Sequence, residues 1–381
     1  MNWVAWKMLT GDRAKYLSIV FGITFASLLM SQQAAIFCGL MRNTASQILD
    51  IQGAEIWVMD PYAQFVDDLR PLSENDLYRV RSVRGVSWAV RLYKGLLRAR
   101  MESGDYQQMI VLGLDDATLI GAPREIVAGK LSDLRLQDAV MIDEAGFHYV
   151  WPGEPLATGK VLELNDHRAV VVGICKASPP FQTFPVLYTR YAQAVQYAPR
   201  ERKVLSFVLA QNDGSISAAE ACRRITAQTG LQALTRDEFF WKTIMYYTRK
   251  TGIPINFGIT VVLGFLVGAA IAGQTFYLFT IENLKQFGAL KAMGVGNARL
   301  TRMILLQASI AGLLGYGLGV GLAVVVGKVI GVLIATSIPP AFFMPWQVLA
   351  GTGIAVLGIA AVASLVSIRR VVVLEPAVVF R

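Results

Sequence analysis

The sequence predicts an α-helical membrane protein with four transmembrane helices plus a large mixed α/β extracytoplasmic domain between the first and second. Two observations lead to this prediction: apolar residues are gathered in long blocks, and basic residues flank those blocks on one side. The 381 residues are 54% hydrophobic and only 17% charged, with a mean hydropathy of +0.46. Such a composition excludes a disordered chain, a collagen and a disulfide-rich miniprotein.

Four apolar blocks are long enough to cross a bilayer, which requires roughly 20 apolar residues in a helix. No charged residue occurs in 17–41 or in 252–281, and Lys328 is the only charge between 303 and 368. Prolines near position 340 divide this last stretch in two. We therefore expect transmembrane helices at 17–41, 253–280, 303–336 and 346–368.

The basic residues indicate which side of the membrane each connection occupies. The short segments 1–16, 281–302 and 369–381 are net positive, whereas 42–252 carries 25 basic and 24 acidic side chains. Because positive segments remain in the cytoplasm, we expect a cytoplasmic amphipathic segment at 1–16, a cytoplasmic tail at 369–381 and both termini inside. The domain at 42–252 and an outer turn at 337–345 then lie outside. A nearly neutral domain also disfavours nucleic-acid binding, which needs a basic face.

The extracytoplasmic segment shows both strand and helix patterns. Ser217 and Glu220 have the spacing of a capping box before a helix that Gly230 ends, and Thr235 and Glu238 repeat that spacing. The second helix continues towards the second span and would link the domain to the membrane. Runs rich in β-branched and aromatic residues predict strands at Ala54–Met59, Val86–Leu92, Met109–Leu114, Ala169–Ile174 and Val204–Leu209.

Catalytic and metal chemistry have weak support in this sequence. His148 and His167 lack the ligand spacing of a zinc site, and we assign no catalytic or metal-binding residue. Cys175 and Cys222 could pair in an oxidising compartment. Cys222 lies on the apolar face of its expected helix, which favours a buried thiol, and the pairing stays open. The sequence has no Gly-x-x-x-x-Gly-Lys-Ser/Thr motif, so any ATP hydrolysis would require another polypeptide.

The segment 281–302 begins with a short amphipathic helix. Ile281, Leu284, Phe287 and Leu290 recur at helical spacing, and Gly294 ends the pattern. Such a helix can lie in the lipid headgroups, dock into a groove on a partner, or cap the second span. Periodicity alone leaves these three uses open.

This segment resembles the coupling segment of FtsX/MacB-type ABC transporter permeases, most closely the DevC-like branch. The shared residues are Glu282, Phe287-Gly288, Leu290-Lys291-Ala292 and Met293-Gly294, and Glu375-Pro376-Ala377 with Arg381 resembles the family's ending. The order of one span, a large external domain and three further spans is also similar. Gln286 departs from the Glu of many relatives, which puts a salt link to the ATPase in doubt. The resemblance assigns ATPase coupling to Glu282, Lys285, Phe287, Gly288, Leu290, Lys291, Met293 and Gly294.

The resemblance implies a permease subunit of an ABC exporter in the bacterial inner membrane, not itself an enzyme. It implies a separate ABC ATPase carrying ATP and Mg, with no cofactor in this chain, and a second copy of the chain. It further implies a periplasmic membrane-fusion protein and an outer-membrane channel. ATP hydrolysis would move the periplasmic domains by mechanotransmission and so export a lipid-like or hydrophobic cargo, whose identity stays open.

Glycines in the expected spans offer close helix approach, and one span carries a charge. Gly-x-x-x-Gly pairs let helices pack tightly in lipid, either between two copies or within one chain. Lys328 lies 25 residues after Met303, roughly 37 Å along a helix. It can therefore snorkel to the outer interface or contact lipid headgroups. The glycine pairs are Gly264 with Gly268, Gly315 with Gly319, and Gly317 with Gly321.

Two related functions share this topology. A lipoprotein-releasing permease would extract lipidated proteins from the membrane. An FtsX-like transmembrane signal transducer would control cell-wall hydrolases, although that class usually has a smaller external domain than 42–252.

Overall fold

The computed structural model describes residues 2–101, 104–199, 205–333 and 341–373. These residues divide into two compact units. Among the described residues, the bundle unit comprises 2–39, 252–333 and 341–373, and the sheet unit comprises 40–101, 104–199 and 205–251. The predicted strand at Val204 begins outside the described residues, as do most of the predicted outer turn and the ending at Glu375–Arg381.

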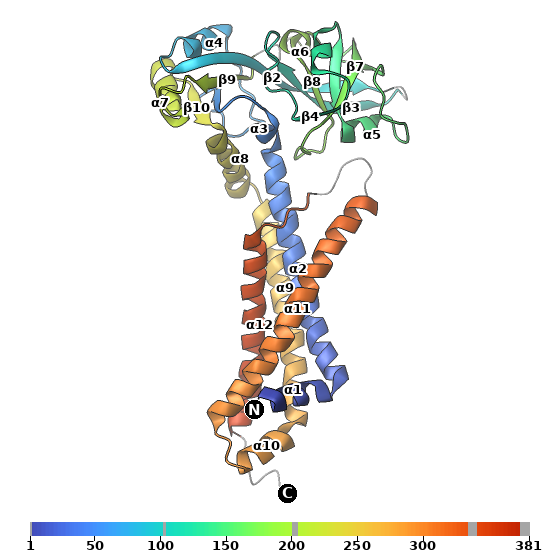
Figure 1. Ribbon diagram of the computed structural model, residues 1–381, viewed down its shortest axis with the longest axis vertical. Coiled ribbons are helices and arrows are strands. Elements are labelled where there is room, and N and C mark those ends of the chain that lie inside the picture. Colours follow the sequence, from blue (N-terminus) through green and yellow to red (C-terminus); the bar gives the residue numbers. More distant parts are fainter. Residues whose placement is uncertain (1, 102–103, 200–204, 334–340, 374–381) are drawn as a thin grey trace. The chain divides into compact units, whose positions relative to one another are not determined.

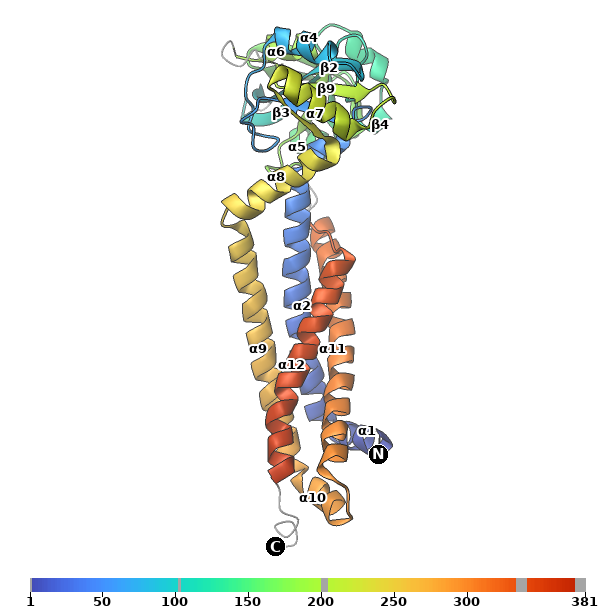
Figure 2. The same cartoon turned by 90° about the vertical axis from the view of Figure 1, so that its left-hand side faces the viewer.

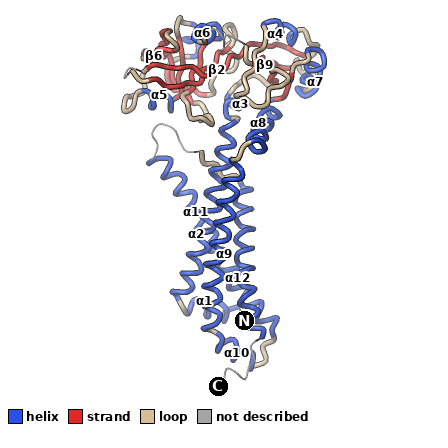
Figure 3. The backbone as a smooth tube through the Cα atoms, turned by 180° about the vertical axis from the view of Figure 1, so that it is seen from behind, coloured by secondary structure: helices blue, strands red, loops and turns tan. Residues whose placement is uncertain are grey.

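In the described part of the bundle unit, all regular secondary structure is helical (Figure 3). Among the described residues, four helices are long and apolar enough to cross a membrane, as the sequence predicts. Figures 1 and 2 show these helices running lengthwise beside one another. The helices are α1 (Asn2–Gly11), α2 (Arg13–Thr44), α9 (Ile253–Glu282), α10 (Leu284–Ala292), α11 (Asn297–Leu333) and α12 (Trp346–Val373), and α2, α9, α11 and α12 are the four candidate spans.

Small and apolar residues hold the bundle together. Helix α12 packs along both α9 and α11, and Phe276, Phe279 and Ile359 are almost completely buried in the shared core. Helix α1 packs on α11, where the buried Gln307 Nε2 donates to the carbonyl oxygen of Ala5 at 2.9 Å. This bond satisfies polar groups that would otherwise be costly in an apolar interior.

The sheet unit contains a ten-stranded mixed sheet within the described residues. Its strand order is β10-β1-β9-β2-β3-β8-β5-β7-β4, and β6 pairs with both β2 and β7. The long strand β2 joins the two halves of this sheet, because Val86–Leu92 pairs with β9 and Tyr93–Arg100 pairs with β3. The strands are β1 (Ile56–Met59), β2 (Val86–Arg100), β3 (Tyr106–Leu114), β4 (Glu125–Ala128), β5 (Ala139–Asp143), β6 (Val161–Leu164), β7 (His167–Lys176), β8 (Val186–Arg190), β9 (Phe207–Asn212) and β10 (Gln232–Thr235).

Both faces of strand β1 are covered, so its residues form a continuous apolar run. All four residues of β1 are buried. Ile56 belongs to one hydrophobic core and Trp57 to the core on the opposite face. The helices of this unit are α3 (Ser46–Asp50), α4 (Glu74–Arg81), the 3₁₀ helix η1 (Leu131–Arg135), α5 (Glu144–Val150), α6 (Tyr191–Tyr197), α7 (Ala218–Thr229) and α8 (Arg236–Lys250).

The two predicted helix starts are present in the structure. The Ser217 side chain accepts a hydrogen bond from the backbone N–H of Glu220, and Gly230 ends α7 in the left-handed conformation with φ of 70°. Thr235 and Glu238 form the full capping box of α8. Phe239 anchors α8 to the sheet by packing 5.5 Å from the Trp57 ring in the buried core.

Candidate functional site

The segment after the second span folds as the short helix α10, which is set off by specific end signals. Asn283 separates α9 from α10, and its side-chain Nδ2 donates to the carbonyl oxygen of Phe279 at 2.8 Å. Beyond α10, Gly294 adopts φ of 88°, a conformation that favours glycine. The Val295 N–H then reaches back to the Leu290 carbonyl at 3.1 Å. This is the 6→1 bond of a Schellman motif, and it fixes where α10 stops.

Helix α10 has one buried face and one exposed face. Phe287 is fully buried in the core of the bundle unit, Gly288 is buried, and Leu290 is half-buried against the same core. Met293 by contrast is 72% exposed. The exposed positions, which we call the α10 face, are Lys285, Gln286, Ala289, Ala292, Met293 and Gly294.

The burial of Phe287 limits which residues of the predicted coupling segment can contact a partner. The apolar stripe of α10 is already buried within this chain, because the chain's own helices cover Phe287 and Gly288. A partner on this helix could therefore contact Lys285, Met293 or Gly294 directly, but it could not reach Phe287 while the bundle is folded.

Two further charged residues of the predicted coupling segment are engaged within the chain. Glu282 forms an ion pair with Lys15, which also pairs with Asp12 at 2.8 Å. Lys291 Nζ donates to the carbonyl oxygen of Val372 at 2.8 Å, near the C-terminal end of α12, where cations are favoured. These contacts join α10 and the end of α9 to α2 and α12.

The predicted glycine pairs divide into two kinds. Gly264 and Gly268 face α2, where a Cβ on Gly268 would overlap the Cβ of Ala26. Gly315 and Gly319 also face α2, and a Cβ on Gly315 would lie 2.7 Å from Ile23. These four glycines therefore pack spans within one chain.

The second kind of glycine faces open space. Added Cβ atoms on Gly317 and Gly321 would meet no heavy atom of the described chain within 4 Å. Of the six glycines named as helix-packing or dimer residues, these two alone leave a helix surface free for lipid or a second copy. Lys328 is exposed on α11, as snorkelling requires.

The two buried cysteines of the sheet unit are free thiols in different hydrophobic cores. Burial raises the pKa of Cys222 to about 12 and raises that of Cys175 well above its ordinary value. Neither is poised to react as a thiolate at neutral pH. Among the described residues, no group of three His, Cys, Asp or Glu side chains could hold a metal ion.

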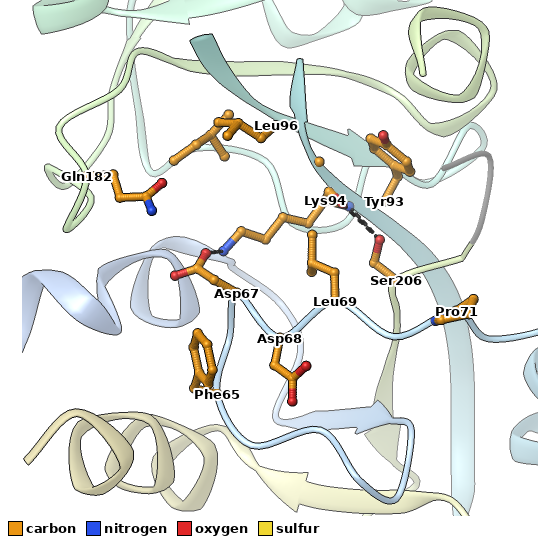
Figure 4. Close-up of a pocket in the computed structure, with 12 residues that line it drawn as sticks. Phe65, Asp67, Asp68, Leu69, Pro71, Tyr93, Lys94, Leu96, Gln182 and Ser206 are labelled. Atoms are coloured by element: carbon orange, nitrogen blue, oxygen red, sulfur yellow. Dashed lines mark hydrogen bonds and ion pairs between the residues drawn. The ribbon is translucent and has the colours of Figure 1, made fainter. Parts of the chain in front are cut away.

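The sequence reasoning missed a cavity in the sheet unit that contains a buried lysine. Lys94, in the middle of β2, has a side chain that is only 4% exposed, and its Nζ lies 2.5 Å from Asp67 Oδ1 (Figure 4). Burial lowers the pKa of Lys94, and the Asp67 carboxylate opposes that shift. The available signal was a lysine flanked by Tyr93 and Gly95 at a buried position of a strand. The cavity has a volume of about 570 Å³.

Comparison with known proteins finds a family model that matches most of the bundle unit. Residues 258–376 match the family described as FtsX-like permease C-terminal, and this stretch includes α10 and the glycine-rich spans. The C-terminal membrane segment is therefore similar to the FtsX-like permeases. This finding agrees with the family resemblance in the sequence, while the DevC-like branch stays a prediction.

Relatives that match part of this chain are described as uncharacterized ABC transporter permeases. Proteins from Mycobacterium bovis and from two strains of Mycobacterium tuberculosis are each 31% identical over 122 residues, which is 32% of this chain. The match spans only a third (33%) of the length of these curated relatives.

Solved structures of external domains from ABC transporters are also similar. The extracellular domain of the ABC-type transporter YknZ from Gram-positive bacteria covers 48% of this chain and 98% of its own length, at 15% identity and a TM-score of 0.34. The periplasmic region of MacB from Actinobacillus actinomycetemcomitans covers 53% of this chain and 95% of its own length, at 12% identity and a TM-score of 0.37.

Proposed function

We propose that this chain is the permease subunit of an ABC transporter and that a separate ATPase, carrying ATP and Mg, docks on the α10 face. The observation that carries the proposal is the match of residues 258–376 to the FtsX-like permeases, because it includes an exposed helix surface between two candidate spans. Met293 and Ala289 offer apolar contact area to a partner, and Lys285 adds a positive charge at its edge.

The buried face of α10 supports mechanotransmission. Phe287 of α10 packs in the bundle core, and Lys291 donates a hydrogen bond to α12. The ion pair between Lys15 and Glu282 connects the end of α9 to α2. Closure of the ATPases on ATP would press on α10, and these contacts would pass the displacement to the spans. The bilayer helices need no pore for this action, which fits spans that contain almost no charge.

In this proposal the protein lies in the bacterial inner membrane with both termini in the cytoplasm and works as a homodimer. The surface of α11 around Gly317 and Gly321 is available for the second copy. Movement of the external domains would pass a lipid-like or hydrophobic cargo to a periplasmic membrane-fusion protein and an outer-membrane channel. Positive-inside charge asymmetry supports this orientation.

The docking step can be tested on the α10 face without disturbing the bundle core. The double variant Ala289→Asp with Met293→Asp places two carboxylates on exposed positions. A tagged wild-type chain purified from its native host should retain vanadate-sensitive ATP hydrolysis, and the double variant should lose it while inserting normally.

A matched control separates docking from general damage. Met245→Asp makes the same exchange on α8 in the sheet unit, where Met245 is 42% exposed. The chain with this substitution should still co-purify with vanadate-sensitive ATP hydrolysis. Phe287→Asp is unsuitable, because an unpaired carboxylate in the core would destabilise the fold. Retention of full ATP hydrolysis by the double variant would show that the ATPase does not dock on the α10 face.

A further inference from the structure

A cavity in the sheet unit has the size and lining of a small-ligand site. Its volume of about 570 Å³ falls within the range of roughly 300–1,000 Å³ that is usual for such sites. Apolar side chains supply most of the wall, and Lys94 extends beneath Leu96 and over Leu69 towards Asp67 (Figure 4). The apolar lining residues that matter here are Phe65, Leu69, Pro71, Leu96 and Ile110.

The Lys94 ammonium has hydrogen-bonding capacity left over. A lysine ammonium has three donors, and its acceptors among the described residues are Asp67 Oδ1 and the Val66 carbonyl oxygen at 3.4 Å. The Lys94 side chain is 4% exposed, so bulk water has little access to the third donor. An acceptor atom on a ligand in the cavity would satisfy that donor.

The charges around the cavity select against an ionic ligand. Asp67 already balances Lys94, so a ligand carboxylate or phosphate would meet the negative charges of Asp67 and Asp68. A ligand cation finds no free counter-charge either, because Asp68 accepts from the Gln64 N–H at 2.9 Å and lies 3.4 Å from Arg70. The lining therefore favours a polar end that carries hydroxyl or carbonyl oxygens and no net charge.

The two walls of the cavity are fastened to helices that continue into candidate spans. Phe65 stacks on Tyr246 of α8 with ring centroids 4.2 Å apart, and α8 leads directly to α9. On the other wall, Gln182 belongs to the loop that Ser178 fastens to Asp50 of α3, with Oγ to Oδ1 at 2.8 Å. Helix α3 directly follows α2 in the chain. A change in the separation of α3 and α8 would thus widen or narrow the cavity.

We propose that this cavity binds a small uncharged amphiphile, with its hydroxyl or carbonyl oxygen on Lys94 Nζ and its apolar body against Leu69, Leu96 and Ile110. The inference rests on the sheet unit alone and is independent of ATPase docking. The same chemistry is offered by a free molecule or by a neutral glycolipid from the membrane.

The test uses the full chain in lipid nanodiscs and an octyl glucoside that carries a photoactivatable diazirine in its alkyl chain. After illumination, peptide mass spectrometry should find labelling at 65–71 and 93–96. Excess octyl glucoside should suppress it, whereas octanoate and octylamine at equal concentration should not. A diacyl glucolipid carrying the same diazirine in the nanodisc distinguishes a membrane source from a free one.

Two variants and a control make the result specific. Leu69→Trp fills the cavity from a wall residue that is 38% exposed and should abolish labelling while leaving the ion pair intact. Replacing the pair by Lys94→Met with Asp67→Leu should weaken binding about tenfold or more, since a hydrogen bond to a charged group is lost. Lys176→Met removes a lysine whose ion pair with Glu125 is exposed and should change nothing.

The proposal fails if residues 65–71 and 93–96 are labelled no more strongly in the wild-type chain than in Leu69→Trp. It also fails if octanoate or octylamine competes as well as octyl glucoside. Because both readouts concern the sheet unit, neither depends on whether an ATPase binds α10.

Discussion

The two kinds of glycine in the spans should respond in opposite ways to a single added methyl group. In Gly268→Ala, the new methyl would overlap the Cβ of Ala26 on α2 and lie 3.2 Å from Ile359, so the helices must separate. In Gly317→Ala, the new methyl would meet no described atom within 4 Å. We expect the first variant to be destabilised and the second to be neutral or stabilised.

The magnitude follows from two terms. Replacing glycine by alanine within a helix stabilises it by roughly 0.5–1 kcal/mol in both variants, so this term cancels in their difference. Overpacking of a close contact typically costs about 1–3 kcal/mol and applies only at Gly268. The free energy of unfolding should therefore be lower in Gly268→Ala than in Gly317→Ala by about 1–3 kcal/mol.

Equilibrium unfolding of the full chain in mixed micelles of a mild detergent and dodecyl sulfate measures this difference. Gly264→Ala serves as an intermediate control, because its methyl would lie 3.4 Å from Leu29, an ordinary contact. A compensating variant that combines Gly268→Ala with Ala26→Gly should recover most of the lost stability. Equal stabilities for the Gly268 and Gly317 variants, or no recovery in the pair, would contradict the packing of α9 against α2.

Two further predictions concern the sheet unit. Asp143 is buried and accepts from the N–H groups of Gly146 and Val186, yet burial raises its pKa to about 6. The folded protein then holds this proton more tightly than the unfolded chain. The stabilisation from this tighter proton binding is complete below about pH 4. It is lost as pH rises through about 6, which lowers the free energy of unfolding by up to about 3 kcal/mol. Hydrogen exchange of β5, corrected for intrinsic rates, should show falling protection over that window, and rising protection would refute the shift. Thr235→Ala removes the capping bond from Glu238 N–H and should lower the free energy of unfolding by about 1 kcal/mol, whereas Thr235→Ser should not.

The spans and the helix caps could be predicted from sequence because their signals are local. An uninterrupted apolar run has few uses other than a span, and Thr235 with Glu238 needs only one turn of chain to form a capping box. Strand β2 was harder, since the prediction stopped at Leu92 while the strand continues to Arg100. Lys94 and Arg98 break its apolar pattern, and only the tertiary fold shows that Asp67 covers Lys94.

The candidate site shows a different limit of sequence reasoning. Periodicity identified the apolar stripe that contains Phe287, but it cannot tell whether a partner or the same chain covers a stripe. The same ambiguity applied to Gly268 and Gly317, which have identical local signals and different surroundings. For the glycines the missing information was the position of α2, and for Phe287 it was the packing of α10 on α9 and α12.

The sidedness of the chain is the claim on which the transporter proposal depends most. Ser215→Cys and Asn297→Cys place single thiols on exposed positions of the sheet unit and of the segment after α10, in a chain whose three native cysteines are replaced. A membrane-impermeant maleimide should label position 215 once the outer membrane is opened. It should label position 297 only after the inner membrane is permeabilised. Labelling of 297 in sealed cells, with 215 protected, would contradict a cytoplasmic coupling helix and an external domain.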